Sequence, residues 1–105
     1  MKYKVNYTKE ALNDLSNIYD YIAYEENEVS NAKRLIDAIR NAIKNLDEFP
    51  NRFPIVTFSP WKELNMRYLC IKNHIAFYLV NDNTSCVNII RIFSSKQNIE
   101  KLILK

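Results

Sequence analysis

The chain has 105 residues, of which 48% are hydrophobic and 26% charged, a composition that fits one globular domain and excludes a disordered polar chain. Residues 51–105 carry eight Lys/Arg against three Asp/Glu, so this half is basic and suits an acidic partner, or is simply a solvated surface. There is no glycine, which excludes glycine-rich phosphate loops, and no apolar run of a secretory signal or membrane span, so we expect a cytoplasmic protein without membrane contact.

The first half of the sequence predicts a strand followed by two amphipathic helices. Residues 2–7 alternate polar and apolar side chains, as a half-buried strand does, and Thr8 is suited to cap the helix that follows. Apolar residues then recur at helical spacing over residues 11–22 and again over residues 32–46. Because the polar link at residues 25–28 is short, we expect the two helices to form an antiparallel hairpin.

The second half predicts a long irregular connection and then a β-meander. All three prolines and Trp61 fall within residues 50–65, which is typical of a loop. Three β-like runs follow, separated by short polar turns: residues 66–71, 75–80 and 87–93. From Ser94 onward, a capping-box pattern and apolar spacing predict a short amphipathic final helix.

The predicted order is therefore β-α-α-β-β-β-α, an α+β fold in a single domain over residues 1–105. Both apolar helix stripes are buried only if the hairpin packs on one face of a small, mainly antiparallel sheet. The alternating residues of the middle run form two apolar sets: Ile75, Phe77 and Leu79 on one face, and Ala76, Tyr78 and Val80 on the other. One hairpin cannot cover both faces, so we expect the opposite face, Trp61 and the tail to be free for partners.

Six segments, in their order and spacing, resemble the RelE/ParE family of bacterial toxins from type II toxin–antitoxin systems. They are EALNDL at 10–15, IYDYIA at 18–23, LDEFP at 46–50, MRY at 66–68, NHIAFY at 73–78 and VNIIRI at 87–92. The resemblance covers nearly the whole chain and is closer to the ParE-like, plasmid-stabilisation branch than to the ribosome-dependent ribonucleases.

The resemblance implies a growth-inhibiting toxin held silent by a cognate antitoxin, which we expect to lie across the exposed sheet face and the hairpin. One branch of the family poisons DNA gyrase, and the other cuts mRNA in the ribosomal A site without a metal, using basic residues and a Tyr or His. Here Ile75 stands where ribonuclease members often have an arginine, and no Tyr or His follows Phe93. We therefore expect gyrase as the target and no cofactor or metal. A ribosome-dependent mRNA endonuclease and a non-toxic basic binding module are the alternatives, so enzymatic activity stays open.

No catalytic residue is assigned, but five basic residues are candidates for contact with the target: Arg67, Lys72, His74, Arg91 and Lys96. His74, the only histidine, could act as a general base, although its place at a predicted hairpin turn favours a solvated residue. Arg67 either contacts the target or antitoxin, or pins the long loop. Arg91 shares an alternation face with Val87, Ile89 and Phe93, so we expect it to be paired across the sheet, with a helix carboxylate as one candidate partner, and to serve a structural role. Lys96 can hold a phosphate as a point charge.

Two aromatic residues are candidate contacts to a protein partner, Trp61 and Tyr78. Trp61, among prolines, either anchors a partner or covers one end of the core. Cys70 and Cys86 lie in predicted strands and are expected to be reduced, small core fillers. The tyrosines around the first helix are expected to serve its packing: Tyr19, Tyr21 and Tyr24.

Overall fold

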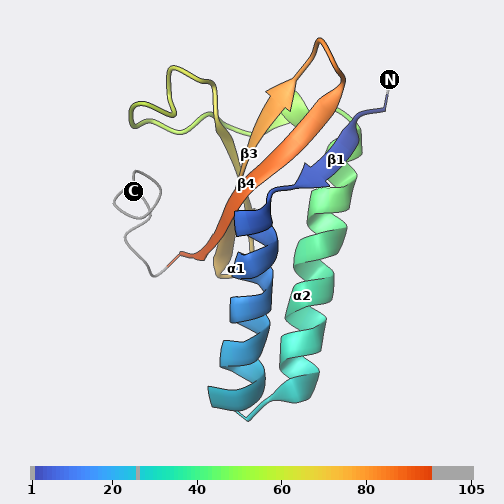
Figure 1. Cartoon of the computed structure of the whole chain (residues 1–105), viewed down its shortest axis with the longest axis vertical. Helices are drawn as coiled ribbons and strands as arrows, with labels where there is room; N and C mark the ends of the chain where they lie inside the picture. Colours follow the sequence, from blue (N-terminus) through green and yellow to red (C-terminus); the bar gives the residue numbers. More distant parts are fainter. Residues whose placement is uncertain (1, 26, 96–105) are drawn as a thin grey trace.

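The computed structural model describes residues 2–25 and 27–95, so Lys96 and the predicted final helix lie outside the described residues. Its elements are β1 (Lys4–Tyr7), α1 (Lys9–Asp20), the π-helical turn η1 (Tyr21–Glu25), α2 (Val29–Lys44), the 3-10 turns η2 (Asn45–Asp47) and η3 (Pro50–Arg52), β2 (Arg67–Ile71), β3 (His74–Asn81) and β4 (Cys86–Ser94). In Figure 1 the helices α1 and α2 stand side by side and extend beyond the lower edge of the sheet. This α+β arrangement, with a helical hairpin on a sheet, confirms the predicted fold class.

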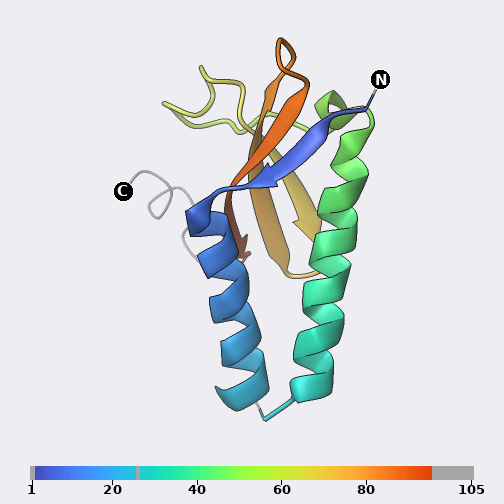
Figure 2. The same cartoon turned by 45° about the vertical axis from the view of Figure 1, so that its right-hand side comes forward.

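The sheet has four strands in the order β1-β4-β3-β2. Strand β1 runs parallel to β4, whereas β2 with β3 and β3 with β4 are antiparallel. Figure 2 shows β1 crossing in front of the meander beside β4 and leading directly into α1. The last strand of the meander is therefore central, and it holds the N-terminal strand in the sheet.

Helix α1 begins where the sequence predicts it. The Thr8 hydroxyl accepts a hydrogen bond from the Ala11 amide at 3.1 Å and donates one to the Ile90 carbonyl at 2.9 Å, so one side chain caps the helix and ties it to β4. At the other end of the hairpin, Asn27 takes a left-handed backbone conformation with φ of 55°, which asparagine tolerates better than most residues. These two residues fix the start of α1 and the reversal into α2.

The main core lies between the hairpin and one face of the sheet. Its buried members come from both helices, from η2 and from all strands except β1: Ala11, Leu15, Ile39, Ile43, Leu46, Leu69, Ile71, Ala76, Tyr78, Val87, Ile89 and Ile92. Tyr78 is completely buried, and its hydroxyl donates to the Pro50 carbonyl at 2.7 Å. Burial raises the pKa of Tyr78 to about 12. The side chain proposed as a partner contact is thus a core residue, because Tyr78 lies on the face that the hairpin covers.

A second apolar cluster occupies the opposite face of the meander. Phe77 and Phe93 are buried there under the segment that follows η3, which contributes Val56, Trp61 and Met66. The expectation that this face is free was therefore wrong for its central part, because the long loop folds back over it. Cys70 is exposed and Cys86 half-buried, so the prediction of core cysteines was wrong for Cys70.

Strand β4 contains a bulge that the alternation of the sequence does not reveal. Phe77 pairs with Arg91 but Tyr78 pairs with Ile89, so Ile90 is an extra residue. The bulge reverses the pattern of faces: Val87 and Ile89 face the helices, whereas Arg91 and Phe93 lie across from Phe77 and its neighbours. Arg91 therefore lies on the opposite face from Val87 and Ile89, whereas the simple alternation of the sequence predicts that the three residues share one face.

Candidate functional site

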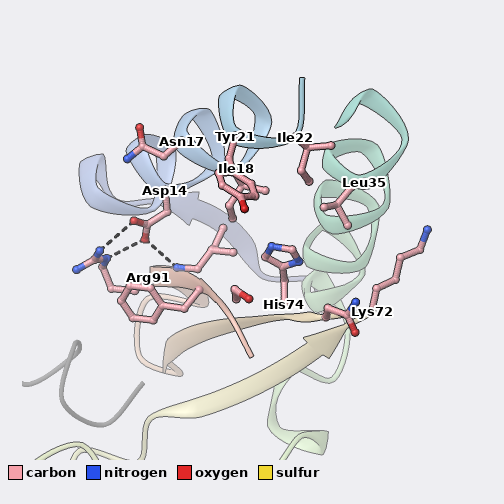
Figure 3. Close-up of a pocket in the computed structure, with 13 residues that line it drawn as sticks. Asp14, Asn17, Ile18, Tyr21, Ile22, Leu35, Lys72, His74 and Arg91 are labelled. Atoms are coloured by element: carbon pink, nitrogen blue, oxygen red, sulfur yellow. Dashed lines mark hydrogen bonds and ion pairs between the residues drawn. The ribbon is translucent and has the colours of Figure 1, made fainter. Parts of the chain in front are cut away.

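A cleft of about 710 Å³ opens between the helical hairpin and the sheet, within the size range of ligand sites. Its walls come from α1 and η1, α2, the turn between β2 and β3, the start of β3 and the end of β4 (Figure 3). Three apolar side chains, Ile18, Ile22 and Leu35, form the helical walls. The polar groups come both from the meander ends and from α1 and η1, which contribute Asp14, Asn17 and Tyr21.

Three of the five basic candidates from the sequence meet in this cleft: Lys72, His74 and Arg91. They come from a turn and two neighbouring strands, and the antiparallel pairing of β3 with β4 brings them together. Arg67 lies outside the cleft, and Lys96 lies outside the described residues. The cleft is therefore the place where the basic second half of the sequence meets the hairpin.

Arg91 is held by Asp14 of α1, as the prediction of a helix carboxylate partner anticipated. Its Nε lies 2.8 Å from Oδ2 of Asp14 and its Nη2 lies 2.9 Å from Oδ1, so the two side chains form a bidentate ion pair. Oδ2 also accepts the amide of Ile92 at 2.9 Å. The hydrogen bond to Asp14 raises the pKa of Arg91. Strand β1 pairs with β4 only as far as Ile89. Beyond that point the Asp14 carboxylate accepts the hydrogen bond from the edge of β4 and so holds α1 against the strand.

The sequence predicts His74 as a solvated turn residue, but the structure places it in a strand and half-buried. The turn is formed by Lys72 and Asn73, and His74 is the first residue of β3, half-buried with its ring directed toward the helices (Figure 3). Its Nδ1 is buried and makes no hydrogen bond within residues 2–25 and 27–95. Burial lowers the pKa of His74 and so favours its neutral form. The site therefore contains an imidazole packed beside apolar side chains, whose enclosed Nδ1 lacks a hydrogen-bond partner in those ranges.

Lys72 lies at the mouth of the cleft. Its backbone has φ of 54°, a left-handed conformation that is unfavourable for a residue with a Cβ, and its side chain is exposed. Across the described part of the chain, no carboxylate lies within ion-pair distance of its ammonium group. Lys72 thus contributes positive charge to the entrance of the cleft.

Arg67 and Trp61 serve the long loop rather than the cleft. The guanidinium of Arg67 donates to the Phe53 carbonyl, and the Val56 amide donates to Met66 at 2.8 Å, so the loop is pinned along β2. Trp61 is half-buried against the second apolar cluster. These contacts fit the structural alternatives of the sequence analysis, loop pinning for Arg67 and core cover for Trp61.

Sequence reasoning missed the role of Asp14 and of the hairpin tip. Asp14 lies between Ala11 and Leu15 on the buried stripe of α1, and a carboxylate within an apolar stripe was the signal that could have identified it. At the tip, Tyr21 and Tyr24 are 60% and 72% exposed, so they do not pack the helix as expected. They leave an apolar rim beside the cleft.

The cleft combines apolar walls, a cationic entrance and an imidazole whose Nδ1 lacks a hydrogen-bond partner among the described residues. Such a site suits an amphipathic segment or an acidic group. In the described ranges, no three His, Cys, Asp or Glu side chains are grouped to hold a metal ion. None of the helices described there is long and apolar enough to cross a membrane.

Comparisons with known proteins agree with this architecture. The profile of the family described as the ParE toxin of type II toxin–antitoxin systems, parDE, matches residues 5–99. A structure of the chromosomal ParDE toxin–antitoxin system from Pseudomonas aeruginosa is similar, with a TM-score of 0.71 and 22% identity over 89% of this chain and 96% of that chain.

Two further structures share the fold. The RelBE2 toxin–antitoxin complex from Mycobacterium tuberculosis has a TM-score of 0.67 and 18% identity, over 90% of this chain and 92% of that chain. A mutant of the Escherichia coli toxin RelE in the free state has a TM-score of 0.68 and 11% identity, over 97% of this chain and 93% of that chain. No curated protein matches the sequence significantly.

Proposed function

Because the chain belongs to the ParE toxin family of type II toxin–antitoxin systems, we propose that it arrests growth by poisoning DNA gyrase and that a cognate antitoxin neutralises it. Family membership supports the toxin part of the proposal. The similar structures from P. aeruginosa and M. tuberculosis belong to toxin–antitoxin systems, which supports the antitoxin part.

The two candidate arginines, Arg67 and Arg91, are already bonded to other groups of the protein, which favours a toxin that acts by binding rather than by cleavage. Metal-free RNA cleavage needs a general base, a general acid and cations that hold the phosphate. Arg91 is committed to Asp14, and Arg67 to the Phe53 carbonyl. The cleft then offers Lys72, His74 and the exposed Tyr21 as its available cationic or titratable groups, a small set for phosphodiester chemistry.

The antitoxin is proposed to bind along the hairpin and in the cleft. The cleft walls are apolar, and the adjoining tip exposes Tyr21, Tyr24 and Val29, which is 54% exposed. An interface of the usual size buries over ~1,000 Å², more than the cleft alone provides. A segment that folds on binding can cover both surfaces in one continuous contact.

The test combines purified proteins with induced cells. The protein is mixed with DNA gyrase and relaxed plasmid, with and without the product of the short reading frame next to its gene. We expect inhibited supercoiling and accumulation of cleaved DNA, both prevented by the neighbouring product. If that product and the toxin stay separate on a sizing column at micromolar concentration, the antitoxin part is wrong.

One observation favours a second function, a ribosome-dependent mRNA endonuclease. The neutral imidazole of His74 could serve as the general base for the ribose 2′-hydroxyl. Primer extension shortly after induction distinguishes the two functions. Cuts within translated codons that disappear in His74→Ala would support the endonuclease and contradict gyrase poisoning, whereas early arrest of replication with intact mRNA supports the proposal.

A further inference from the structure

The charge that the cleft presents to a ligand is positive. The titratable groups that line it around His74 are Asp14 and Tyr21 from α1 and η1, Lys72 from the turn, and Arg91 from β4, whereas α2 contributes Leu35. Asp14 is nearly buried and accepts three hydrogen bonds, from Arg91 and from the Ile92 amide, so its charge is neutralised internally. Lys72 remains as the cation at the entrance.

The half-buried imidazole of His74 is the titratable group in the cleft that this internal pairing leaves without a charged partner among the described residues. Its Nδ1 is enclosed and has no hydrogen-bond partner there, so a ligand that reaches the edge of the ring or shifts it can supply the missing bond and remove the cost of an unpaired polar atom. A neutral imidazole has one donor and one acceptor nitrogen, but an imidazolium donates from both. A carboxylate brought against the ring is therefore a matching group, since it accepts a hydrogen bond and stabilises the protonated form.

The apolar walls restrict what else the ligand carries. Ile18, Ile22 and Leu35 lie on the helical side of the cleft, facing His74 (Figure 3), so a ligand with a carboxylate alone would leave these side chains in contact with water. A peptide segment with an acidic and an apolar side chain on the same face fills both parts of the cleft. A helix presents such a pair at spacings of three or four residues.

We propose that the antitoxin segment in this cleft places a carboxylate against His74, that His74 takes up a proton from solvent on binding, and that Lys72 adds attraction at the entrance. An apolar side chain of the same segment packs between Ile18, Ile22 and Leu35. This inference rests on the proposed function, in which an antitoxin occupies the cleft. The uptake of a proton by His74 makes neutralisation of the toxin dependent on pH.

The direction of the pH dependence follows from proton linkage. Burial lowers the pKa of His74 in the free toxin, and the carboxylate raises it in the complex. Between these two pKa values each bound segment takes up one proton, so the dissociation constant decreases by up to about tenfold for each unit that the pH falls. Above the pKa of the complex, affinity does not change with pH.

The experiment measures the dissociation constant of the toxin for the product of the neighbouring reading frame from pH 5.5 to 8.5. His74→Gln keeps a polar side chain but cannot titrate, and we expect it to abolish the pH dependence. Lys72→Gln should weaken binding about threefold, mainly through a slower association that depends on salt. Lys62→Gln, an exposed lysine of the long loop away from the hairpin and the cleft, is the matched control and should change nothing.

A second measurement needs no variant, because His74 is the only histidine. With only the toxin isotopically labelled, its imidazole is titrated by NMR alone and in the complex. A higher pKa in the complex, with pH-dependent affinity, supports the proposal. Tight binding with an unchanged or lower pKa of His74, or a pH dependence retained in His74→Gln, overturns it and leaves the antitoxin assignment intact. Absence of any binding instead refutes the antitoxin part of the proposed function.

Discussion

The ion pair between Asp14 and Arg91 predicts a large and asymmetric loss of stability when either partner is removed. Arg91→Ala leaves the Asp14 carboxylate nearly buried with the Ile92 amide as its remaining partner among those described. Asp14→Asn keeps an oxygen for that amide and leaves an arginine that reaches water. We therefore expect Arg91→Ala to be the more damaging change.

The magnitude follows from the exposure of the two side chains. Removing one partner of a buried ion pair lowers the free energy of unfolding by about 3–5 kcal/mol. The Asp14 side chain is 10% exposed, but that of Arg91 is 30% exposed, so water partly screens the pair. We expect the lower end of the range for Arg91→Ala, about 3 kcal/mol, and about 2 kcal/mol for Asp14→Asn. Either loss is a large part of the ~5–15 kcal/mol that stabilises a typical domain.

Urea denaturation at pH 7, followed by circular dichroism, measures these differences. Arg34→Ala on α2 is a control, since it removes an exposed arginine and should change the free energy of unfolding by less than about 0.5 kcal/mol. The double variant should lose less than the sum of the single ones, because each single change leaves an unpaired group. A loss below about 1 kcal/mol for Arg91→Ala, or a greater loss for Asp14→Asn, would refute the reasoning.

Three further predictions concern single side chains. Thr8→Ala removes the cap of α1 and the bond to Ile90, so we expect a loss of about 1–2 kcal/mol in urea denaturation, whereas Thr8→Ser should retain most of the stability. Tyr78→Phe leaves the Pro50 carbonyl unpaired and should lose about 1–2 kcal/mol. Because the pKa of Tyr78 is raised to about 12 in the folded state, its advantage over phenylalanine is full below pH 10 and disappears as the pH rises through 12. For His74 the folded pKa is lowered, so urea midpoints should fall as the pH drops below about 6.5, and less so in His74→Gln.

Features that depend on local pattern were predictable from the sequence. The stripes over residues 11–22 and 32–46 identify the helices because burial of one face requires that spacing. Thr8 was recognised as a cap from its position before the first stripe. The pairing of Arg91 with a helix carboxylate was predicted because an arginine in an apolar strand needs a partner.

Features that depend on distant contacts were not predictable. No glycine or proline marks the bulge at Ile90, so the alternation of β4 suggested a regular strand. The alternation separates the faces of β3 but does not say which one the hairpin covers, so Tyr78 was assigned to the surface. The burial of His74 depends on helices that precede it by about 40 residues or more along the chain, although its neighbours in sequence are those of a turn.

The central position of β4 determines when this domain becomes complete during synthesis. Residues 1–85 contain β1, both helices and two strands, yet β1 has no neighbour in the sheet until residues 86–94 have entered between it and β3. The Asp14 carboxylate also finds both of its partners there. A nascent or prematurely ended chain that stops before β4 therefore has neither the continuous four-stranded sheet nor the cleft, and both form only once residues 86–94 have been synthesised.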